Sequence, residues 1–114
     1  MKKKQVVCEI EVTISMLGGK WKPLILYYLG DEGVKRFGQI KSFIKTISHK
    51  TLTNQLKQLE QDGLVLRTVY PEVPPKVEYS LTDMGKSLIP ILEAMCAWGE
   101  KHMKDKYELI NPLC

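Results

Sequence analysis

The segment from His49 to Gln61 combines residue types that can read the edges of nucleic acid bases. Its leucines stand at Leu52, Leu56 and Leu59, a spacing that predicts a helix with one apolar face. At about 100° per residue, polar side chains gather on the opposite face. Amides there can hydrogen-bond adenine, lysines can contact guanine or phosphate, and threonines can contact either. The candidate set is His49, Lys50, Thr51, Thr53, Asn54 and Lys57.

This helix has a clear beginning and end in the sequence. Ser48 is a favourable N-cap, and Asp62-Gly63 ends the apolar repeat. The acidic Glu60 comes late in the helix, away from the end that enters a groove. Taken alone, the polar face is explained equally well as an ordinary solvated surface. The residues that follow favour a binding role.

Directly after this helix come two β-prone runs, 64–70 and 77–81, separated by a segment rich in proline. Because proline is excluded from helix interiors and inner strands, the pattern predicts a hairpin with a stiff loop. A helix followed by such a hairpin is the order of a winged helix, which places both elements against a DNA groove and its flanking backbone. Backbone contacts are expected from Arg67, Tyr70 and Lys76 on the hairpin and from Lys41 on the preceding helix.

Three helices are expected before this point. The first covers 9–17 and ends at Gly18-Gly19, and the second covers 21–29 and is closed by Gly30 and Gly33. A very short strand at Arg36-Phe37 is expected to pair with the hairpin, followed by a third helix over 38–44. The tight connection from this helix to the next is that of a helix-turn-helix.

A long helix capped by Thr82 is expected to run to residue 106, with a kink at Pro90 because proline removes a backbone hydrogen bond. Its apolar positions recur every three or four residues from Met84 to His102, which suits burial against another helix. The most available partner is a second copy of the chain, although the stripe could instead pack only on its own domain. The predicted dimer interface comprises Ile10, Ile14, Leu88, Ile91, Met95 and Trp98.

Composition narrows the class of protein. A chain of 114 residues with 44% hydrophobic content fits one domain, and its net charge of +4 agrees with a polyanionic partner without requiring one. The lysines at 2–4 are followed by Glu9 and Glu11, which interrupt the apolar core of an export signal, and no apolar run could span a bilayer. We expect a cytoplasmic protein with no membrane contact, metal or cofactor.

The three cysteines are widely separated and lack a CxxC spacing, so neither a disulfide framework nor a zinc site is indicated. No phosphate loop, paired acids or Ser/His/Asp set is present, which argues against an enzyme. Cys8 is expected at the first turn of the first helix, just after three lysines, where the helix dipole and the positive charge favour its thiolate form, whereas Glu9 and Glu11 oppose it. A redox-sensing role for Cys8 therefore competes with simple apolar packing.

Several motifs occur in a specific order along nearly the whole chain. They are Cys8, Gly-Gly-Lys-Trp at 18–21, Arg36-Phe37, Ile47-Ser48, Leu52-Thr53, 56–63, Tyr70, Pro74-Pro75, 77–82 and Gly85. Together they resemble the HxlR-type winged-helix transcriptional regulators of bacteria, relatives of the MarR group. The resemblance implies a homodimer that forms through the first and last helices and binds DNA upstream of the genes it controls.

In some of these relatives the early cysteine senses quinones, aldehydes or hypochlorite, through thiol modification or an intersubunit disulfide. Here Cys8 is followed by Glu9, where many relatives have proline. The resemblance therefore extends to the cysteine itself but not to its immediate neighbour.

We expect one mainly α domain over 1–114 with a small β-hairpin. It comprises a winged helix-turn-helix over 36–81 and dimerisation helices over 8–17 and 82–106. The expected function is sequence-specific binding of double-stranded DNA as a homodimer on a roughly palindromic operator, with Cys8 sensing as an added hypothesis. The alternative is a winged-helix module that uses the same surface for protein partners. A thiol-based redox enzyme is a third reading, disfavoured by the lack of a resolving cysteine pattern. No residue identifies a small-molecule effector.

Overall fold

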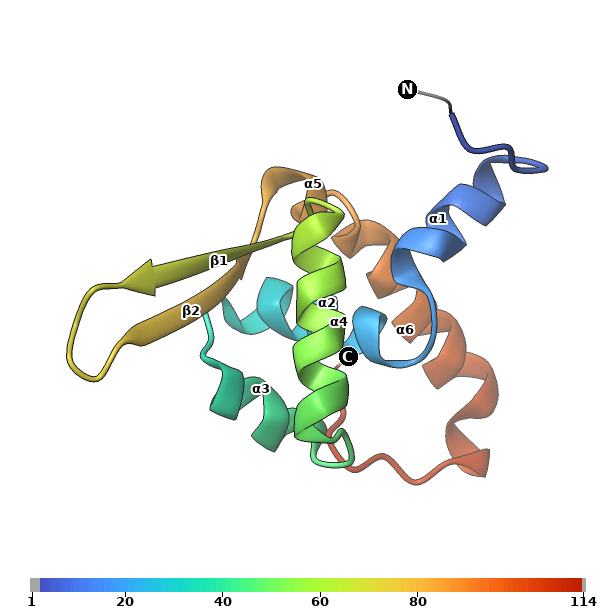
Figure 1. The fold of residues 1–114 in the computed structure, drawn as a ribbon. Coiled ribbons are helices and arrows are strands. Elements are labelled where there is room, and N and C mark those ends of the chain that lie inside the picture. The colour runs from blue at the N-terminus through green and yellow to red at the C-terminus, as the bar shows by residue number, and fades with distance from the viewer. Residues whose placement is uncertain (1–2, 114) are drawn as a thin grey trace.

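The computed structural model describes residues 3–113 and shows a helical body from which a two-stranded antiparallel hairpin projects on one side (Figure 1). The helices are α1 (Glu9–Leu17), α2 (Trp21–Glu32), α3 (Phe37–Ile44), α4 (His49–Gln61), α5 (Asp83–Lys86) and α6 (Ile89–Met103), with a 3-10 turn η1 (Lys104–Lys106). The strands are β1 (Val65–Tyr70) and β2 (Lys76–Leu81). This is the expected winged helix-turn-helix order.

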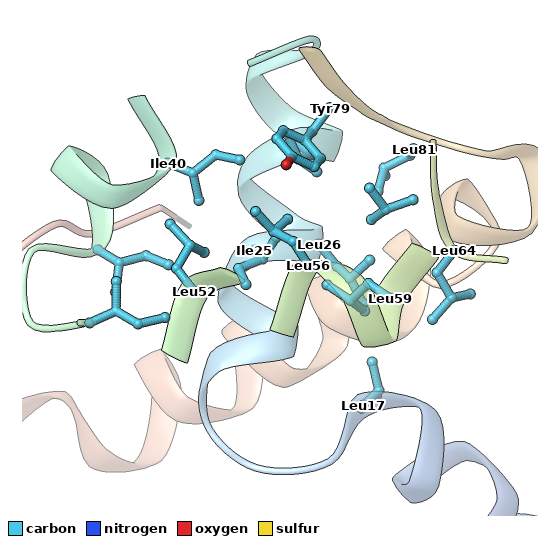
Figure 2. Packing of buried hydrophobic residues seen from close by; sticks show 14 of the residues in the cluster. Leu17, Ile25, Leu26, Ile40, Leu52, Leu56, Leu59, Leu64, Tyr79 and Leu81 are labelled. Atoms are coloured by element: carbon cyan, nitrogen blue, oxygen red, sulfur yellow. The ribbon is translucent and has the colours of Figure 1, made fainter. Parts of the chain in front are cut away.

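The core forms where α2 and α4 pack against each other and against the base of the hairpin (Figure 2). Ile25 and Leu26 of α2 are fully buried, as are Leu52 and Leu59 of α4. Tyr79 of β2 continues the same cluster. Each aliphatic side chain buried in this way stabilises the fold by roughly 1.5–3 kcal/mol, so the position of α4 is fixed by its leucines.

Helix α4 begins and ends where the sequence predicts. The Ser48 hydroxyl oxygen accepts the backbone N–H of Thr51 at 3.1 Å, which satisfies one of the free amides of the first turn. After Asp62 the chain passes through Gly63 at φ +76, a conformation that glycine adopts without a steric penalty. Helix α4 is therefore held at both ends.

The turn between α3 and α4 contains an unusual backbone conformation at Lys45. Its φ of 65° and ψ of −54° are those of a γ-turn with positive φ, which is the rare and strained form. The Thr46 N–H closes this turn by donating to the Ile44 carbonyl at 2.7 Å. The Lys45 N–H also donates to the Lys41 carbonyl at 2.8 Å, which completes the last turn of α3. A lysine here stores backbone strain within the helix-turn-helix.

Strands β1 and β2 pair from Val65 opposite Leu81 to Tyr70 opposite Lys76. The expected strand at Arg36-Phe37 is wrong: Lys35 alone bridges to Tyr79, through bonds of 3.0 and 2.8 Å. The Arg36 N–H instead donates to the Gln39 side chain at 2.9 Å, which begins α3. Because that amide caps a helix, it cannot extend the ladder.

Gly30 was expected to close the second helix, and this is also wrong. Helix α2 continues through Gly30 to Glu32 and ends at Gly33, whose φ is +86 and whose N–H donates to the Leu29 carbonyl at 2.9 Å. A Cβ at Gly30 would clash with the side chain of Ile89. Glycine at this position therefore serves close packing of α2 against the start of α6.

The expected single long C-terminal helix is two helices. Thr82 caps only α5, which ends at Lys86, and α6 starts at Ile89 with Pro90 in its first turn. Proline lacks an N–H and clashes with the carbonyl four residues earlier, so a break replaces the expected kink. In the first turn of a new helix the same proline is favourable.

Thr82 also connects three elements at the base of the hairpin. Its hydroxyl donates to the Gly63 carbonyl at 2.6 Å and accepts the Gly85 N–H at 3.0 Å, while its own N–H donates to the Leu64 carbonyl at 3.1 Å. Gly85 is required here, because a Cβ would overlap the Leu64 carbonyl. The end of α4, the start of β1 and α5 are thus joined at one residue.

Helix α1 projects from the body and buries only Leu17 (Figure 1). No helix in the described part of the chain is long and apolar enough to cross a membrane.

Candidate nucleic-acid interface

The side of α4 opposite its leucines carries Lys50, Asn54, Lys57 and Gln61, all exposed. They lie three or four residues apart and so form one stripe along the helix. Within residues 3–113, none of these four side chains forms a hydrogen bond or an ion pair with the rest of the protein. The stripe therefore offers amide and ammonium groups that are free to bind a partner.

The other three candidates on α4 already have internal contacts. Thr51 accepts the Ser48 hydroxyl at 2.9 Å, and the Thr53 hydroxyl donates to the His49 carbonyl at 2.9 Å. The His49 ring lies against Phe37 of α3, with centroids 4.6 Å apart. These three side chains are therefore less free to bind a partner than those of the stripe.

A hollow of about 370 Å³ separates α4 from the hairpin. Lys57 and Arg67 line it together with Thr53, Glu60 and the Tyr79 ring. Lys57 and Arg67 thus place two cations around this space beside the stripe of α4, and Glu60 adds one carboxylate. Such an arrangement suits a backbone phosphate on the side nearest the cations.

The hairpin candidates fall on two different faces. Residues directly opposite one another in an antiparallel ladder share a face, so Arg67 lies with Tyr79 on the side that packs toward α4. Tyr70 and Lys76 are opposite each other on the other side, one step from Glu78. Arg67, Tyr70 and Lys76 therefore do not form a single surface.

Tyr70, Lys76 and Glu78 form a cluster of their own. The Lys76 Nζ is 3.6 Å from the Glu78 carboxylate and 4.9 Å from the centre of the Tyr70 ring. A hydrogen bond to the Glu78 carboxylate, with its negative charge, raises the pKa of the Tyr70 hydroxyl. Glu78 was missed from the sequence, although its position two residues from Lys76 on one strand places both on the same face. Its charge opposes phosphate at this end of the wing.

Lys41 lies in the last turn of α3 and is half-buried. Its position is consistent with the favourable interaction between a cation and the carbonyl end of a helix. It is not among the residues that line the hollow between α4 and the hairpin. Lys41 is therefore separate from the Lys57 and Arg67 pair.

The proposed dimer residues are mostly exposed. Ile10 and Ile14 of α1 are 70% and 61% exposed, and Met95 and Trp98 of α6 are 49% and 59% exposed. Ile91 is also exposed, whereas Leu88 is half-buried and packs on the chain's own core. Both helices therefore expose large apolar side chains to solvent in the single chain.

Cys8 is a free, exposed thiol at the N-cap of α1. Glu11 accepts the Val7 N–H at 3.1 Å, which places a carboxylate beside the same helix start. Among residues 3–113, no group of three His, Cys, Asp or Glu side chains could hold a metal ion.

A sequence model of the HxlR-like helix-turn-helix family matches residues 16–107. An uncharacterised HTH-type transcriptional regulator of Halalkalibacterium halodurans is 55% identical over 93 residues, which are 82% of this chain and 82% of that protein.

Two solved regulators have the same fold. The redox regulator HypR in its oxidised form is 47% identical with a TM-score of 0.78, over 85% of this chain and 99% of that one. The reduced form of the transcriptional regulator YodB from B. subtilis is 39% identical with a TM-score of 0.74, over 90% of this chain and 100% of that one. These relatives are regulators rather than enzymes, and this chain belongs to the HxlR-like helix-turn-helix family of transcriptional regulators.

Proposed function

We propose that the protein binds double-stranded DNA sequence-specifically, with α4 in the major groove and the hairpin beside it. The observation that carries this proposal is the unpartnered stripe of Lys50, Asn54 and Lys57 on a helix fixed by its buried leucines. An amide can distinguish adenine in the major groove, and lysines supply affinity for phosphate and guanine. Lys57 and Arg67 together bind a phosphate at the junction of helix and wing.

The proposed active form is a homodimer built through α1 and α6, over residues 8–17 and 82–106. The exposed apolar residues of these helices support it, since two-fold pairing would remove Ile14, Met95 and Trp98 from water. A dimer that binds one face of B-DNA places its two recognition helices about 34 Å apart, so the operator is roughly palindromic.

The direct test is selection of bound fragments from random DNA at about 150 mM salt, which suppresses purely electrostatic binding. We expect enrichment of an inverted repeat. A folded protein that enriches no sequence would contradict the proposal. It would also favour the alternative of a winged-helix module that binds protein partners.

Asn54 is the residue we expect to carry base preference. Asn54→Ala should change the selected sequence at one position of each half-site, with a loss of about 1–3 kcal/mol against the original operator. Gln55→Ala, a half-buried amide on the leucine side of the same helix, is the matched control and should leave the selected sequence unchanged.

We also propose that Cys8 senses oxidants or electrophiles. Its thiol is exposed at the start of α1, beside the proposed dimer surface, and a similar protein, HypR, is described as a redox regulator. Hypochlorite oxidises such a thiol to a sulfenic acid and releases chloride. A second thiol then displaces water to form a disulfide. A change at α1 would alter the dimer and so the spacing of the two α4 helices.

Cys8→Ser separates this proposal from DNA binding itself. The variant should bind the operator as the wild type does but should no longer respond to hypochlorite. A variant that remains fully responsive would remove Cys8 from the mechanism while leaving the DNA-binding proposal intact.

A further inference from the structure

Lys22, in the first turn of α2, is a charged side chain that the fold buries without a partner. It is 8% exposed and is the one charged residue that is buried in the described part of the chain. Among residues 3–113, its ammonium group forms no ion pair and no hydrogen bond. Covering a charge without pairing it costs free energy, because the charge loses hydration. An anion bound at this point would supply the missing partner.

The ammonium group of Lys22 is accessible although the rest of the side chain is covered. No buried side-chain nitrogen or oxygen of the described residues lacks a hydrogen bond, so the unpaired Lys22 Nζ must reach the surface. Side chains on a helix lean toward its N-terminus, which directs Lys22 over Gly18 and Gly19. A Cβ at Gly19 would meet no atom within 4 Å, so this side is open. The charge of Lys22 is therefore directed to the start of α2.

The backbone at the start of α2 offers further donors. Lys20 is the N-cap residue, its side chain forms no cap bond, and the first turn contains no acidic residue. Within the described residues, no loop carbonyl or side chain accepts the N–H of Trp21 or Lys22. Free N–H groups and the positive end of the helix dipole both favour an anion.

Lys20 adds a second cation at the same helix end. Its Nζ lies 4.3 Å from the centre of the Trp21 ring, which holds it close to the first turn. Two ammonium groups and two backbone N–H groups can donate to one anion at this point. A phosphate group matches this number of donors, because it presents several strong acceptor oxygens.

This helix end lies on the opposite side of α4 from the hairpin (Figure 1). Helix α2 packs against α4 in the core, so its start has a fixed position beside that helix. Lys57 and Arg67 line the hollow on the hairpin side. A helix that lies in the major groove has a phosphate backbone along each of its sides. The start of α2 is therefore placed for the backbone that the wing does not reach.

We propose that the start of α2 is a phosphate-binding site, in which the N–H groups of Trp21 and Lys22 and the ammonium groups of Lys20 and Lys22 hold one phosphate group. In the complex with DNA, this group is a backbone phosphate on the side of α4 away from the wing. That assignment to DNA rests on the proposed function, whereas binding of free phosphate does not.

The first experiment titrates inorganic phosphate into the full chain without DNA and follows backbone amide chemical shifts. We expect saturable shifts of the Trp21 and Lys22 amides at about millimolar phosphate. Lys22→Met keeps the covered aliphatic chain but removes the charge, and should weaken binding by about 3-fold or more. Lys22→Arg should restore it. Lys86→Met, on exposed α5, is the matched control and should bind phosphate as the wild type does.

Thermal unfolding distinguishes a ligand-binding lysine from a structural one. In buffer without phosphate, Lys22→Met should melt at the same temperature as the wild type or higher, because it removes an unpaired charge. Added phosphate should raise the melting temperature of the wild type more than that of the variant. No saturable binding of phosphate, or equal binding by the wild type and Lys22→Met, would overturn the proposal.

The second experiment replaces single operator phosphates by uncharged methylphosphonates. One position in each half-site should lower wild-type affinity by about 3- to 10-fold but leave the affinity of Lys22→Met unchanged, since that contact is already lost. If free phosphate binds with the expected variant pattern but no position depends on Lys22, the assignment to DNA is overturned and the ligand is a free phosphate. A wild type that selects no operator contradicts the proposed function instead, and the result with free phosphate stands.

Discussion

Helix α4 and the pair α1 and α6 are all amphipathic, but only α4 covers its apolar face within the chain. Leu52, Leu56 and Leu59 are at most 2% exposed, whereas Ile14 and Trp98 are 61% and 59% exposed. Both regions show apolar residues three or four positions apart. The same periodicity therefore serves the fold in one case and remains available for association in the other.

The difference follows from the position of each helix. Helix α4 has α2 on one side and β1 along its end, so its leucines enter an enclosed space. Helix α1 packs through Leu17 and the partly buried Met16 at its end, and α6 is buried chiefly at Leu92. Helix α4 is thus fixed by the chain itself, which suits the proposed recognition of DNA, whereas the apolar faces of α1 and α6 stay exposed, which suits the proposed dimer.

The largest expected effect is the loss of stability caused by a substitution among the buried leucines of α4. Leu59→Ala should lower the free energy of unfolding by about 2–5 kcal/mol, because it removes a fully buried side chain and leaves a cavity. Denaturant unfolding measures this loss, which should be the same at high and low protein concentration. Trp98→Ala is the comparison, since its effect should decrease on dilution as the dimer dissociates. If the loss of unfolding free energy depended on protein concentration equally in Leu59→Ala and Trp98→Ala, the two helices would not differ in the way described.

The next effect concerns self-association. Trp98→Glu should weaken dimerisation by about 30-fold or more, because aromatic residues central to an interface contribute about 2 kcal/mol or more. Sedimentation equilibrium gives the dissociation constant directly. Val34→Glu is the control, as Val34 is 53% exposed but lies in the turn after α2, outside the proposed interface. If both substitutions act alike, the α6 stripe is not the dimer surface.

A smaller effect distinguishes Lys57, which has no internal partner among the described residues, from Lys76, which pairs with Glu78. Lys57→Ala should lower operator affinity by several-fold and reduce the slope of log K against log salt by about 1. Lys76→Ala should change both less, because Lys76 is paired with Glu78 at 3.6 Å. Affinities measured between about 50 and 200 mM salt give both slopes. A larger loss of affinity and of salt dependence in Lys76→Ala than in Lys57→Ala would indicate that the wing, rather than α4, provides the main phosphate contact.

The smallest expected effect is an increase in DNA affinity. Glu78→Gln should raise DNA affinity by about 2- to 3-fold at low salt, since it removes a repelling charge and frees Lys76. Glu100→Gln, an exposed carboxylate on α6, changes the net charge equally and serves as the control. An equal gain in both variants would assign the effect to overall charge rather than to the wing.

Much of this architecture was predictable because local patterns and tertiary packing agree in it. The Ser48 cap, the leucines of α4 and the proline-rich loop each favour one structure, and the structure contains all three. Prediction failed where a distant contact determined the outcome. Gly30 was read as a helix terminator, but its role depends on Ile89, which is far away in sequence.

The site was predictable in part. Periodicity identified the polar stripe of α4, because one helix face is defined by sequence spacing alone. It did not separate Arg67 from Tyr70 and Lys76, since the faces of a hairpin depend on the register between its strands. Nor did it single out Lys22, because the burial of that lysine depends on how α2 packs against the rest of the chain.

The Thr82 junction has a consequence for the proposed complex with DNA. Bonds to Gly63, Leu64 and Gly85 hold the hairpin at its base, while the loop at its far end, including the fully exposed Val73, extends away from the body (Figure 1). Because the base is fixed beside the end of α4, any bending of the hairpin would displace its tip most and Arg67 least. In the proposed complex, grooves of different width would therefore be accommodated at the tip, while the distance from α4 to Arg67 would stay nearly constant.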